Sequence, residues 1–262
     1  MTLNILISCM HQDKSIIERS NVQSDVVVIN QCNENKREEF KFLNKNGREC
    51  KALFISTTER GLSRSRNMAL RNAWGDICLI CDDDETLYDD CEEKIMRAYE
   101  EYPEAGVIAF AFYRIDKPAY FSDKHKKMGL KEIMKTASIQ ITFKRSLIDE
   151  YAIFFDEKMG SGTGNGGGEE NKFLYDYFKK GVPMYYVPFY ITTLDNHESM
   201  WRNGFTEEYF RNWGWASRRI LGPWLGAAYI AYILLRHYNN YSAESSFWNA
   251  MKNLSKGFLE NR

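Results

Sequence analysis

The chain has 262 residues, of which 44% are hydrophobic, with 35 Lys and Arg against 36 Asp and Glu. This composition supports a real core and excludes a disordered or collagen-like chain, and the net charge of -1 excludes a generally basic surface, so we expect no nucleic acid partner. One large α/β unit with a helical appendage is more typical at this length than two equal domains.

Short apolar runs rich in Ile, Val and Leu recur through the first half of the chain. They cover residues 3–9, 25–30, 51–56, 76–81 and 106–113. Because they show little polar alternation, we interpret them as strands that are covered on both faces, as in a mostly parallel sheet. Helical stretches at residues 62–74 and 88–102 lie between them. This order predicts a doubly wound open sheet that binds ligands beyond the carboxyl ends of its strands.

The second half of the chain is less regular. Residues 138–143 predict a strand, residues 169–180 a helix and residues 184–190 another strand. We expect the main domain to cover residues 1–200, and residues 201–262 to form a helical appendage.

An acidic cluster follows the buried run at residues 77–81. It consists of Asp82, Asp83, Asp84 and Glu85. On an extended backbone Asp82 and Asp84 point the same way, so two carboxylates converge at the ligand edge of the sheet. Such like charges cost stability unless they are compensated, and a bound Mg²⁺ or Mn²⁺ carrying a phosphorylated ligand would compensate them. The alternative is a solvated acidic turn before the next helix.

A second acidic pair, Glu169 and Glu170, follows six glycines in residues 160–168. The glycine spacing matches a dinucleotide fingerprint, but two glutamates at the helix start would repel a pyrophosphate, so we reject that interpretation. This glycine density indicates a mobile loop that folds over a ligand, with acids at its base available to a hydroxyl nucleophile. The alternatives are a flexible linker and the ordinary preference of glutamate for helix N-termini.

Taken in order, these motifs resemble glycosyltransferase family 2, which has the GT-A fold. The resemblance spans roughly residues 3–200. It rests on a first strand and turn at residues 5–11, a second strand with a polar end at 26–33, GLSRSRN at 61–67, GDICLICDDDE at 75–85, and GGEEN at 167–171 followed by Phe173 and Leu174. The family implies a metal-dependent inverting transfer from a nucleoside-diphosphate sugar to a hydroxyl acceptor. The nucleotide-sugar half would cover residues 1–113 and the acceptor half residues 114–200.

The resemblance also implies roles for individual residues. Asp82 would contact the ribose or a metal-bound water, and Asp84 would bind the Mn²⁺ or Mg²⁺ that bridges the diphosphate, with His197 completing its shell. Glu170 would be the general base, and Glu169 would help to hold the acceptor. The other residues implied in nucleotide-sugar binding are Gln31, Arg64, Asn67 and Asp83. The resemblance does not decide whether Arg60, Arg64 or Arg66 faces the phosphates.

Two positions depart from the family pattern. The turn after the second strand reads NQCN at residues 30–33, where the family often has aspartates, and the base motif has Glu-Glu in place of Glu-Asp. Two other function classes fit part of the pattern. A sugar-nucleotide pyrophosphorylase would carry a glycine-rich basic loop at residues 8–13, which is not found there, and Glu170 with its glycine loop argues against a non-catalytic nucleotide- or glycan-binding module.

The tail is strongly aromatic, with five of the six Trp beyond residue 200. Residues 220–235 carry no charge, but at about 1.5 Å per residue they reach roughly 24 Å, short of the ~30 Å hydrocarbon core of a bilayer. The tail therefore either packs on the main domain and walls an acceptor pocket, or lies on a membrane surface where a lipid-linked acceptor is found.

The expected setting is cytoplasmic, either free or at the inner face of a membrane. The N-terminus has no basic leader, and the six cysteines show no disulfide framework. We expect a UDP- or GDP-linked donor, a glycan or lipid-linked acceptor, and a role in bacterial-type surface polysaccharide or glycoconjugate assembly.

Overall fold

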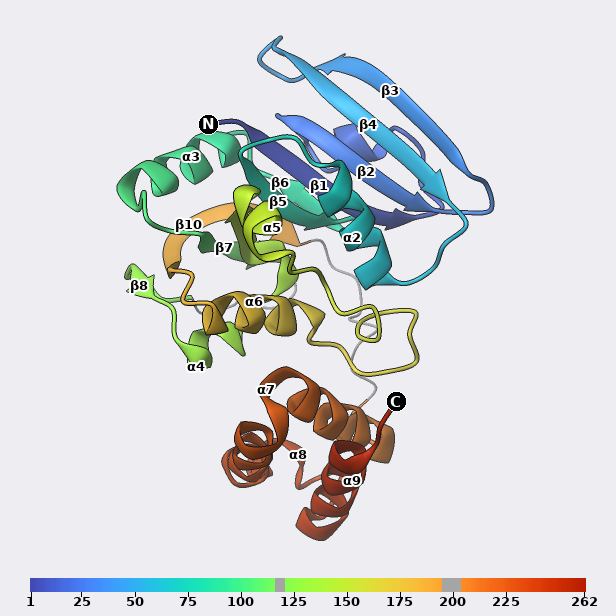
Figure 1. Cartoon of the computed structure of the whole chain (residues 1–262), viewed down its shortest axis with the longest axis vertical. Helices are drawn as coiled ribbons and strands as arrows, with labels where there is room; N and C mark the ends of the chain where they lie inside the picture. Colours follow the sequence, from blue (N-terminus) through green and yellow to red (C-terminus); the bar gives the residue numbers. More distant parts are fainter. Residues whose placement is uncertain (116–120, 195–203) are drawn as a thin grey trace.

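The protein, seen in a computed structural model that describes residues 1–115, 121–194 and 204–262, is built on one twisted sheet of ten strands (Figure 1). The strands are β1 Leu3–Met10, β2 Asp25–Gln31, β3 Lys36–Leu43, β4 Glu49–Thr57, β5 Ile77–Asp82, β6 Glu85–Leu87, β7 Val107–Arg114, β8 Lys126–Lys127, β9 Ile141–Lys144 and β10 Met184–Leu194. Their order is β3-β4-β2-β1-β5-β9-β7-β10-β6, and β8 also pairs with β10.

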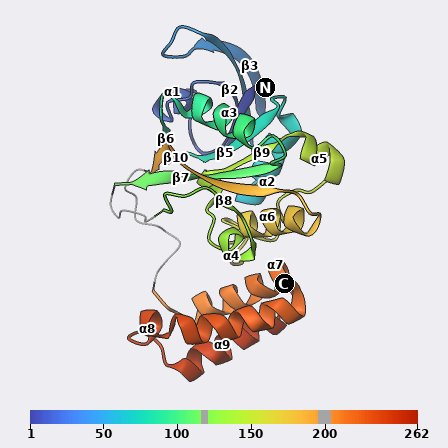
Figure 2. The same cartoon turned by 90° about the vertical axis from the view of Figure 1, so that its left-hand side faces the viewer.

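Helices cover both faces of this sheet (Figure 2). They are α1 Ile16–Arg19, α2 Leu62–Asn72, α3 Cys91–Glu101, α4 Leu130–Ile133, the 3-10 turn η1 Ser138–Gln140, α5 Ser146–Tyr151, α6 Glu169–Lys179, α7 Glu207–Arg236, α8 Tyr238–Tyr241 and α9 Phe247–Leu259. Helices α1 and α3 pack on one face, and α2, α5 and α6 pack on the other, each with its own cluster of buried apolar side chains. The sheet thus has a hydrophobic layer on each side, as the continuous apolar runs indicate.

The predicted fold class is confirmed. All five strands predicted in the first half are present as β1, β2, β4, β5 and β7, with ends shifted by one or two residues. Strands β4, β2, β1 and β5 are neighbours and run parallel, and β7 runs parallel to β10. The helices predicted at residues 62–74, 88–102 and 169–180 are α2, α3 and α6. The described tail is helical and aromatic, as expected.

Several strands differ from the sequence prediction. The short strands β6 and β8 were not predicted, and β10 continues to Leu194, beyond the predicted end at residue 190. The strand predicted at residues 138–143 begins only at Ile141, because residues 138–140 form the turn η1. Strand β3 was missed: its sequence KREEFKFL carries five charged residues, and it pairs antiparallel with β4 at the edge of the sheet. Charged side chains suit an edge strand, which does not need two apolar faces.

The described appendage, residues 204–262, has a core of its own and also docks on the main domain. Helices α7 and α9 approach so closely that a Cβ atom on Gly214 would lie 2.0 Å from the carbonyl oxygen of Leu254. On another face of α7, Trp215 and Ile220 join the buried cluster of the sheet and α6. The predicted boundary at residues 200 and 201 lies outside the described residues.

Helix α7 is kinked at Gly222, whose φ of 77° belongs to the left-handed region, immediately before Pro223. Proline cannot continue the hydrogen-bond ladder of a helix, and glycine tolerates the positive φ, which explains the bend. Across the described ranges of the chain, we find no helix with the length and apolar character needed to span a bilayer.

Candidate active site

The carboxyl ends of four parallel strands meet at one edge of the sheet. In the strand register Ser8 lies beside Asp82, and Gln31 lies beside both Met10 and Thr57. The acidic turn, residues 82–84, therefore stands at the edge where open α/β sheets bind ligands.

Arg66 joins this acidic turn to the second acidic pair. Its guanidinium is 3% exposed and donates to Asp82 Oδ1 at 2.9 Å and to Glu169 Oε1 at 2.8 Å. Ser138 Oγ donates to Asp82 Oδ2 at 3.1 Å, and the guanidinium carbon lies 5.5 Å from the centre of the Phe155 ring. Burial opposes the charge of Arg66, but Asp82 and Glu169 raise its pKa above the ordinary value. Arg66 was left open beside Arg60 and Arg64 as a phosphate contact, and its bridging position between Asp82 and Glu169 was not foreseen.

Glu170 is partly buried beside this ion pair. Burial raises the pKa of its carboxyl to about 8, the charge of Glu169 adds to the effect, and Arg66 opposes it. A carboxyl whose pKa lies near neutrality can exchange a proton with a bound hydroxyl group, which is the property that a general base needs.

Glu85 is a buried carboxyl directly behind the acidic turn. It is 3% exposed, and its Oε1 accepts a hydrogen bond from the backbone N–H of Asp82 at 2.7 Å. Burial raises its pKa well above the ordinary value, and the charges of Asp82 and Asp84 raise it further. Both causes disfavour the ionised form of Glu85.

The other predicted donor-binding residues fall into two groups. Gln31 and Asn67 are buried and hold other segments in place: Gln31 Oε1 accepts from the backbone N–H of Gly61 at 2.8 Å, and the Asn67 amide bonds both backbone polar groups of Phe155, at 2.8 and 2.9 Å. This placement does not favour a nucleotide contact for Asn67.

Arg64 and Asp83 face outward. Arg64 is 52% exposed and lies 3.4 Å from Glu157. Asp83 Oδ2 accepts from Met10 N and Gln12 Nε2, each at 3.4 Å. His197 lies outside the described residues.

The acidic turn offers its carboxylates to a divalent cation. Among the described residues, no group of three or more His, Cys, Asp or Glu side chains is arranged to hold a metal ion. Mg²⁺ usually binds through one or two carboxylates together with substrate phosphates, so a preformed cage is not required. The carboxylates of Asp82 and of the partly exposed Asp84, which add to the effect of burial on the pKa of Glu85, fit a cation that binds together with a diphosphate.

The glycine loop at residues 160–168 packs closely against its neighbours. The backbone carbonyl of Ser161 accepts from Leu62 N at 3.0 Å, at the start of α2. A Cβ atom on Gly166 would lie 2.8 Å from the carbonyl oxygen of Asn212 in α7. Glycine at this position thus permits a close approach to another backbone, a packing role that the sequence analysis did not recognise.

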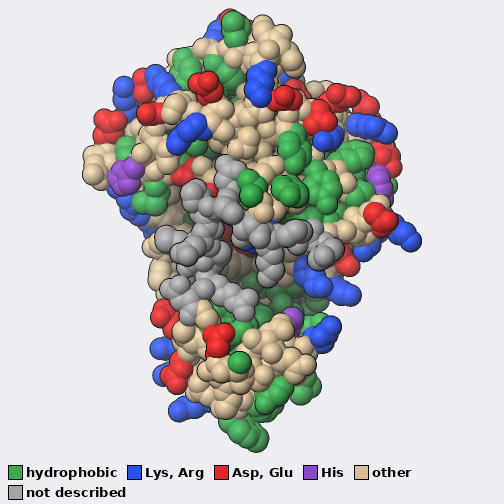
Figure 3. All heavy atoms as spheres, turned by 180° about the vertical axis from the view of Figure 1, so that it is seen from behind, with side chains coloured by type: hydrophobic (Ala, Val, Ile, Leu, Met, Phe, Trp, Pro, Cys, Tyr) green, Lys and Arg blue, Asp and Glu red, His purple; other side chains and the backbone are tan. Residues whose placement is uncertain are grey.

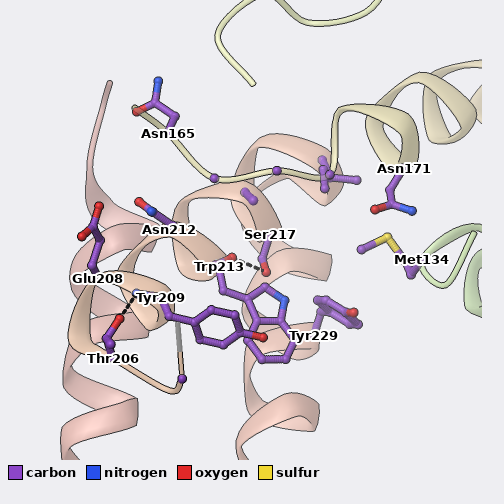
Figure 4. Close-up of a pocket in the computed structure, with 16 residues that line it drawn as sticks. Met134, Asn165, Asn171, Thr206, Glu208, Tyr209, Asn212, Trp213, Ser217 and Tyr229 are labelled. Atoms are coloured by element: carbon purple, nitrogen blue, oxygen red, sulfur yellow. Dashed lines mark hydrogen bonds between the residues drawn. The ribbon is translucent and has the colours of Figure 1, made fainter. Parts of the chain in front are cut away.

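A pocket of about 490 Å³ opens between the glycine loop and α7 (Figure 4). Gly166, Gly167 and Gly168 line it from the loop, and Tyr209 and Trp213 line it from α7. The prediction that tail aromatics wall a pocket thus has a counterpart in the structure.

The comparisons with known proteins agree with this architecture. No curated protein matches the chain. TarS residues 1–349 of S. aureus, in complex with UDP-GlcNAc, has 16% identity over 98% of this chain and 82% of that one, with a TM-score of 0.66. The mannosyltransferase PcManGT from Pyrobaculum calidifontis, in complex with GDP-Man and Mn²⁺, has 13% identity over 98% and 85% of the two chains, with a TM-score of 0.55.

At these identities the likeness shows a shared fold. The family model described as Glycosyl transferase family 2 matches residues 14–159, which is more than half of the chain. The match includes the acidic turn and Arg66, while Glu169 and Glu170 follow it. This chain therefore belongs to glycosyltransferase family 2 and is a glycosyltransferase.

Proposed function

We propose that this protein is a metal-dependent inverting glycosyltransferase that moves a sugar from a UDP- or GDP-linked donor to a hydroxyl acceptor. The observation that carries the proposal is the bridge from Asp82 through Arg66 to Glu169. It joins the ligand edge of the sheet to the start of α6, where Glu170 lies. Three similar structures contain UDP-GlcNAc, UDP or GDP-Man, which favours a donor of the same class.

The acceptor side of the reaction rests on Glu170. The acceptor oxygen attacks the anomeric carbon while the bond from that carbon to the diphosphate breaks, and Glu170 takes the hydroxyl proton. Arg66 Nη1 lies 2.8 Å from Glu169 Oε1, and this ion pair holds the start of α6 close to the acidic turn. Glu169 also contributes to holding the acceptor. A single displacement with one base and no protein nucleophile inverts the anomeric carbon.

The donor side rests on the acidic turn. Asp84 would hold Mn²⁺ or Mg²⁺ together with His197, and Asp82 would contact the ribose or a bound water. A cation bound there neutralises charge on the departing diphosphate. Asp83 and Arg64 face outward near this edge and are further contacts for the donor. Gln31 has an indirect role, because its side chain accepts a hydrogen bond from the backbone N–H of Gly61 and so positions the segment before α2.

We expect one donor in a panel of UDP- and GDP-sugars to be slowly hydrolysed when Mn²⁺ or Mg²⁺ is present. EDTA should stop the release of UDP or GDP, and Asp84→Asn should raise the metal concentration needed for half-maximal rate by about tenfold or more, because a metal ligand is lost. Asp89→Asn, which changes an exposed aspartate five residues further along the chain, is the matched control. Full release in EDTA would contradict metal dependence, and no release from any donor would contradict the function.

We also propose that the protein works at the inner face of a membrane, in bacterial-type surface polysaccharide or glycoconjugate assembly. Large hydrophobic side chains are exposed on the appendage (Figure 3). They are Trp224, Leu225, Tyr232, Leu235, Tyr238, Trp248 and Leu259. The uncharged part of α7 that carries most of them is flanked by exposed Arg218 and Arg236. An apolar face with aromatic residues and flanking cations matches an anionic lipid surface.

The full chain should co-sediment with vesicles of phosphatidylethanolamine and phosphatidylglycerol. Trp224→Ser with Leu235→Ser should weaken this binding about tenfold or more, because burying one such side chain contributes about 1.5–3 kcal/mol. Leu43→Ser, which removes an exposed leucine from β3, should leave it unchanged. Equal binding by both variants, or a shift of the chain to a dimer that masks the face, would contradict the membrane proposal.

A further inference from the structure

The pocket between the glycine loop and α7 is continuous with the start of α6. Gly168 and Asn171 both line it, and they flank Glu169 and Glu170 in the chain. The pocket therefore begins within one helical turn of the proposed base. Its volume of about 490 Å³ is typical of small-molecule sites.

The α7 wall of the pocket is aromatic. The rings of Tyr209 and Trp213 lie 5.4 Å apart with an angle of 67° between them, and both side chains are partly buried. Tyr229 lines the pocket beside them, as Figure 4 shows, and burial raises its pKa. Aromatic faces of this kind pack against the C–H face of a sugar ring, which is apolar although the ring edge is polar.

Amide groups surround the aromatic wall. Asn171 Nδ2 donates to the backbone carbonyls of Ile133 and Thr136 at 2.8 and 3.0 Å, so its Oδ1 remains for a ligand. Asn212 Oδ1 accepts from Arg262 at 2.6 Å, so its Nδ2 remains as a donor. One fixed acceptor and one fixed donor suit the hydroxyl groups at the edge of a sugar ring.

The charge of the lining residues indicates whether the pocket suits the acceptor or the nucleotide-sugar donor. No Lys or Arg stands among its described lining residues, and Glu208 is the charged side chain there. Two phosphates would find no cation among these described residues, which therefore do not favour a nucleoside diphosphate. They favour a neutral polyhydroxy ligand.

We infer that this pocket binds a neutral sugar ring of the acceptor, stacked on Trp213 and Tyr209, and that the appendage thereby forms part of the acceptor site. The assignment rests on the proposed function, since it supplies the acceptor for the base at Glu170. The close packing of α7 against the glycine loop at Gly166 brings the aromatic residues of α7 to this pocket. The aromatic residues of α7 thus have two separate uses: one set faces this pocket, and the set around Trp224 faces solvent.

The test uses the full chain and the methyl glycosides of glucose, galactose, mannose and N-acetylglucosamine as probes, with saturation-transfer NMR as the readout. At least one glycoside should bind, and Trp213→Ala should weaken its binding about tenfold, equivalent to about 1.4 kcal/mol. Trp74→Ala, which removes a tryptophan 39% exposed beside β2, should leave binding unchanged. Thermal unfolding checks that each variant is folded.

Asn212→Ala provides a second variant in case Trp213→Ala does not fold, because it removes the donor and leaves the aromatic pair intact. It too should weaken the binding of the same glycoside. Binding that is equal in wild type and both folded variants, or no binding by any of the four probes, would overturn the assignment. Donor hydrolysis by the wild-type chain needs no acceptor, so its absence would contradict the proposed function and not the pocket.

Discussion

Replacing Glu170 with glutamine should lower the rate of sugar transfer by about 10²- to 10⁴-fold, the usual contribution of a well-placed general base. The amide keeps the shape of the side chain but cannot take the acceptor proton. Donor binding should stay close to wild type, because Glu170 stands on α6 and the donor edge is formed by the strand ends around Asp82. Nucleotide release in the presence of acceptor measures the first effect, and calorimetric titration with the donor measures the second.

Two controls show whether the loss is chemical. Glu93→Gln changes an exposed glutamate of α3 and should leave the rate unchanged. The pKa of Glu170 is raised from 4.5 to about 8 in the folded protein, so the unfolded chain loses this proton more readily. The ionisation of Glu170 therefore lowers the free energy of unfolding, by an amount that grows as the pH rises from 4.5 to about 8. The glutamine variant lacks this destabilisation, and at pH 8 it should be at least as stable as the wild type in thermal unfolding.

The pH dependence supplies a further check on the same residue. A base whose pKa is raised to about 8 is protonated below that pH, so kcat/KM for the donor should rise with pH and level off above about 8. The residual activity of the glutamine variant should lack this limb. Normal turnover by Glu170→Gln, or an unchanged pH limb, would remove Glu170 from the role of base.

The strands of the main domain could be predicted because they are buried on both faces, which leaves a continuous apolar run such as ICLIC before Asp82. Strand β3 could not be found by that rule, because an edge strand with charged residues lacks the pattern. Helix α6 was predicted with an end within one residue of the observed one, since the glycine loop marks its start and Gly181 follows its end. Local signals therefore located the elements.

The site residues were less predictable, because their roles depend on distant partners. Arg64 and Arg66 share one short motif, yet the Arg64 side chain is half-exposed. The Arg66 side chain is buried between Asp82, which follows it by 16 positions in the sequence, and Glu169, which follows it by 103 positions. Only the packing of α2 against the sheet and α6 decides between the two arginines. Likewise, no sequence pattern shows that Glu85 is buried behind the acidic turn and Asp84 is partly exposed.

Replacing Arg66 with methionine should destabilise the protein by about 3–5 kcal/mol, because removal of one partner leaves buried carboxylates without a counter-ion. Glu169 is 4% exposed and receives the Arg66 guanidinium at 2.8 Å, so water cannot readily replace the cation. Urea unfolding measures the change. Arg64→Met is the matched control on the same helix: its ion pair with Glu157 is exposed, so it should cost at most about 1 kcal/mol.

The double variant Arg66→Met with Glu169→Gln distinguishes an unpaired charge from lost packing. If the unpaired carboxylate causes the loss, neutralising Glu169 should recover part of the stability, and the two changes should be strongly non-additive. If the loss came from the packing of Arg66 on Phe155 alone, the second change would recover nothing. Transfer should stay impaired even where stability recovers, because the bridge from Asp82 to the start of α6 is still absent. A loss below about 1 kcal/mol in Arg66→Met would show that the bridge is not needed for folding.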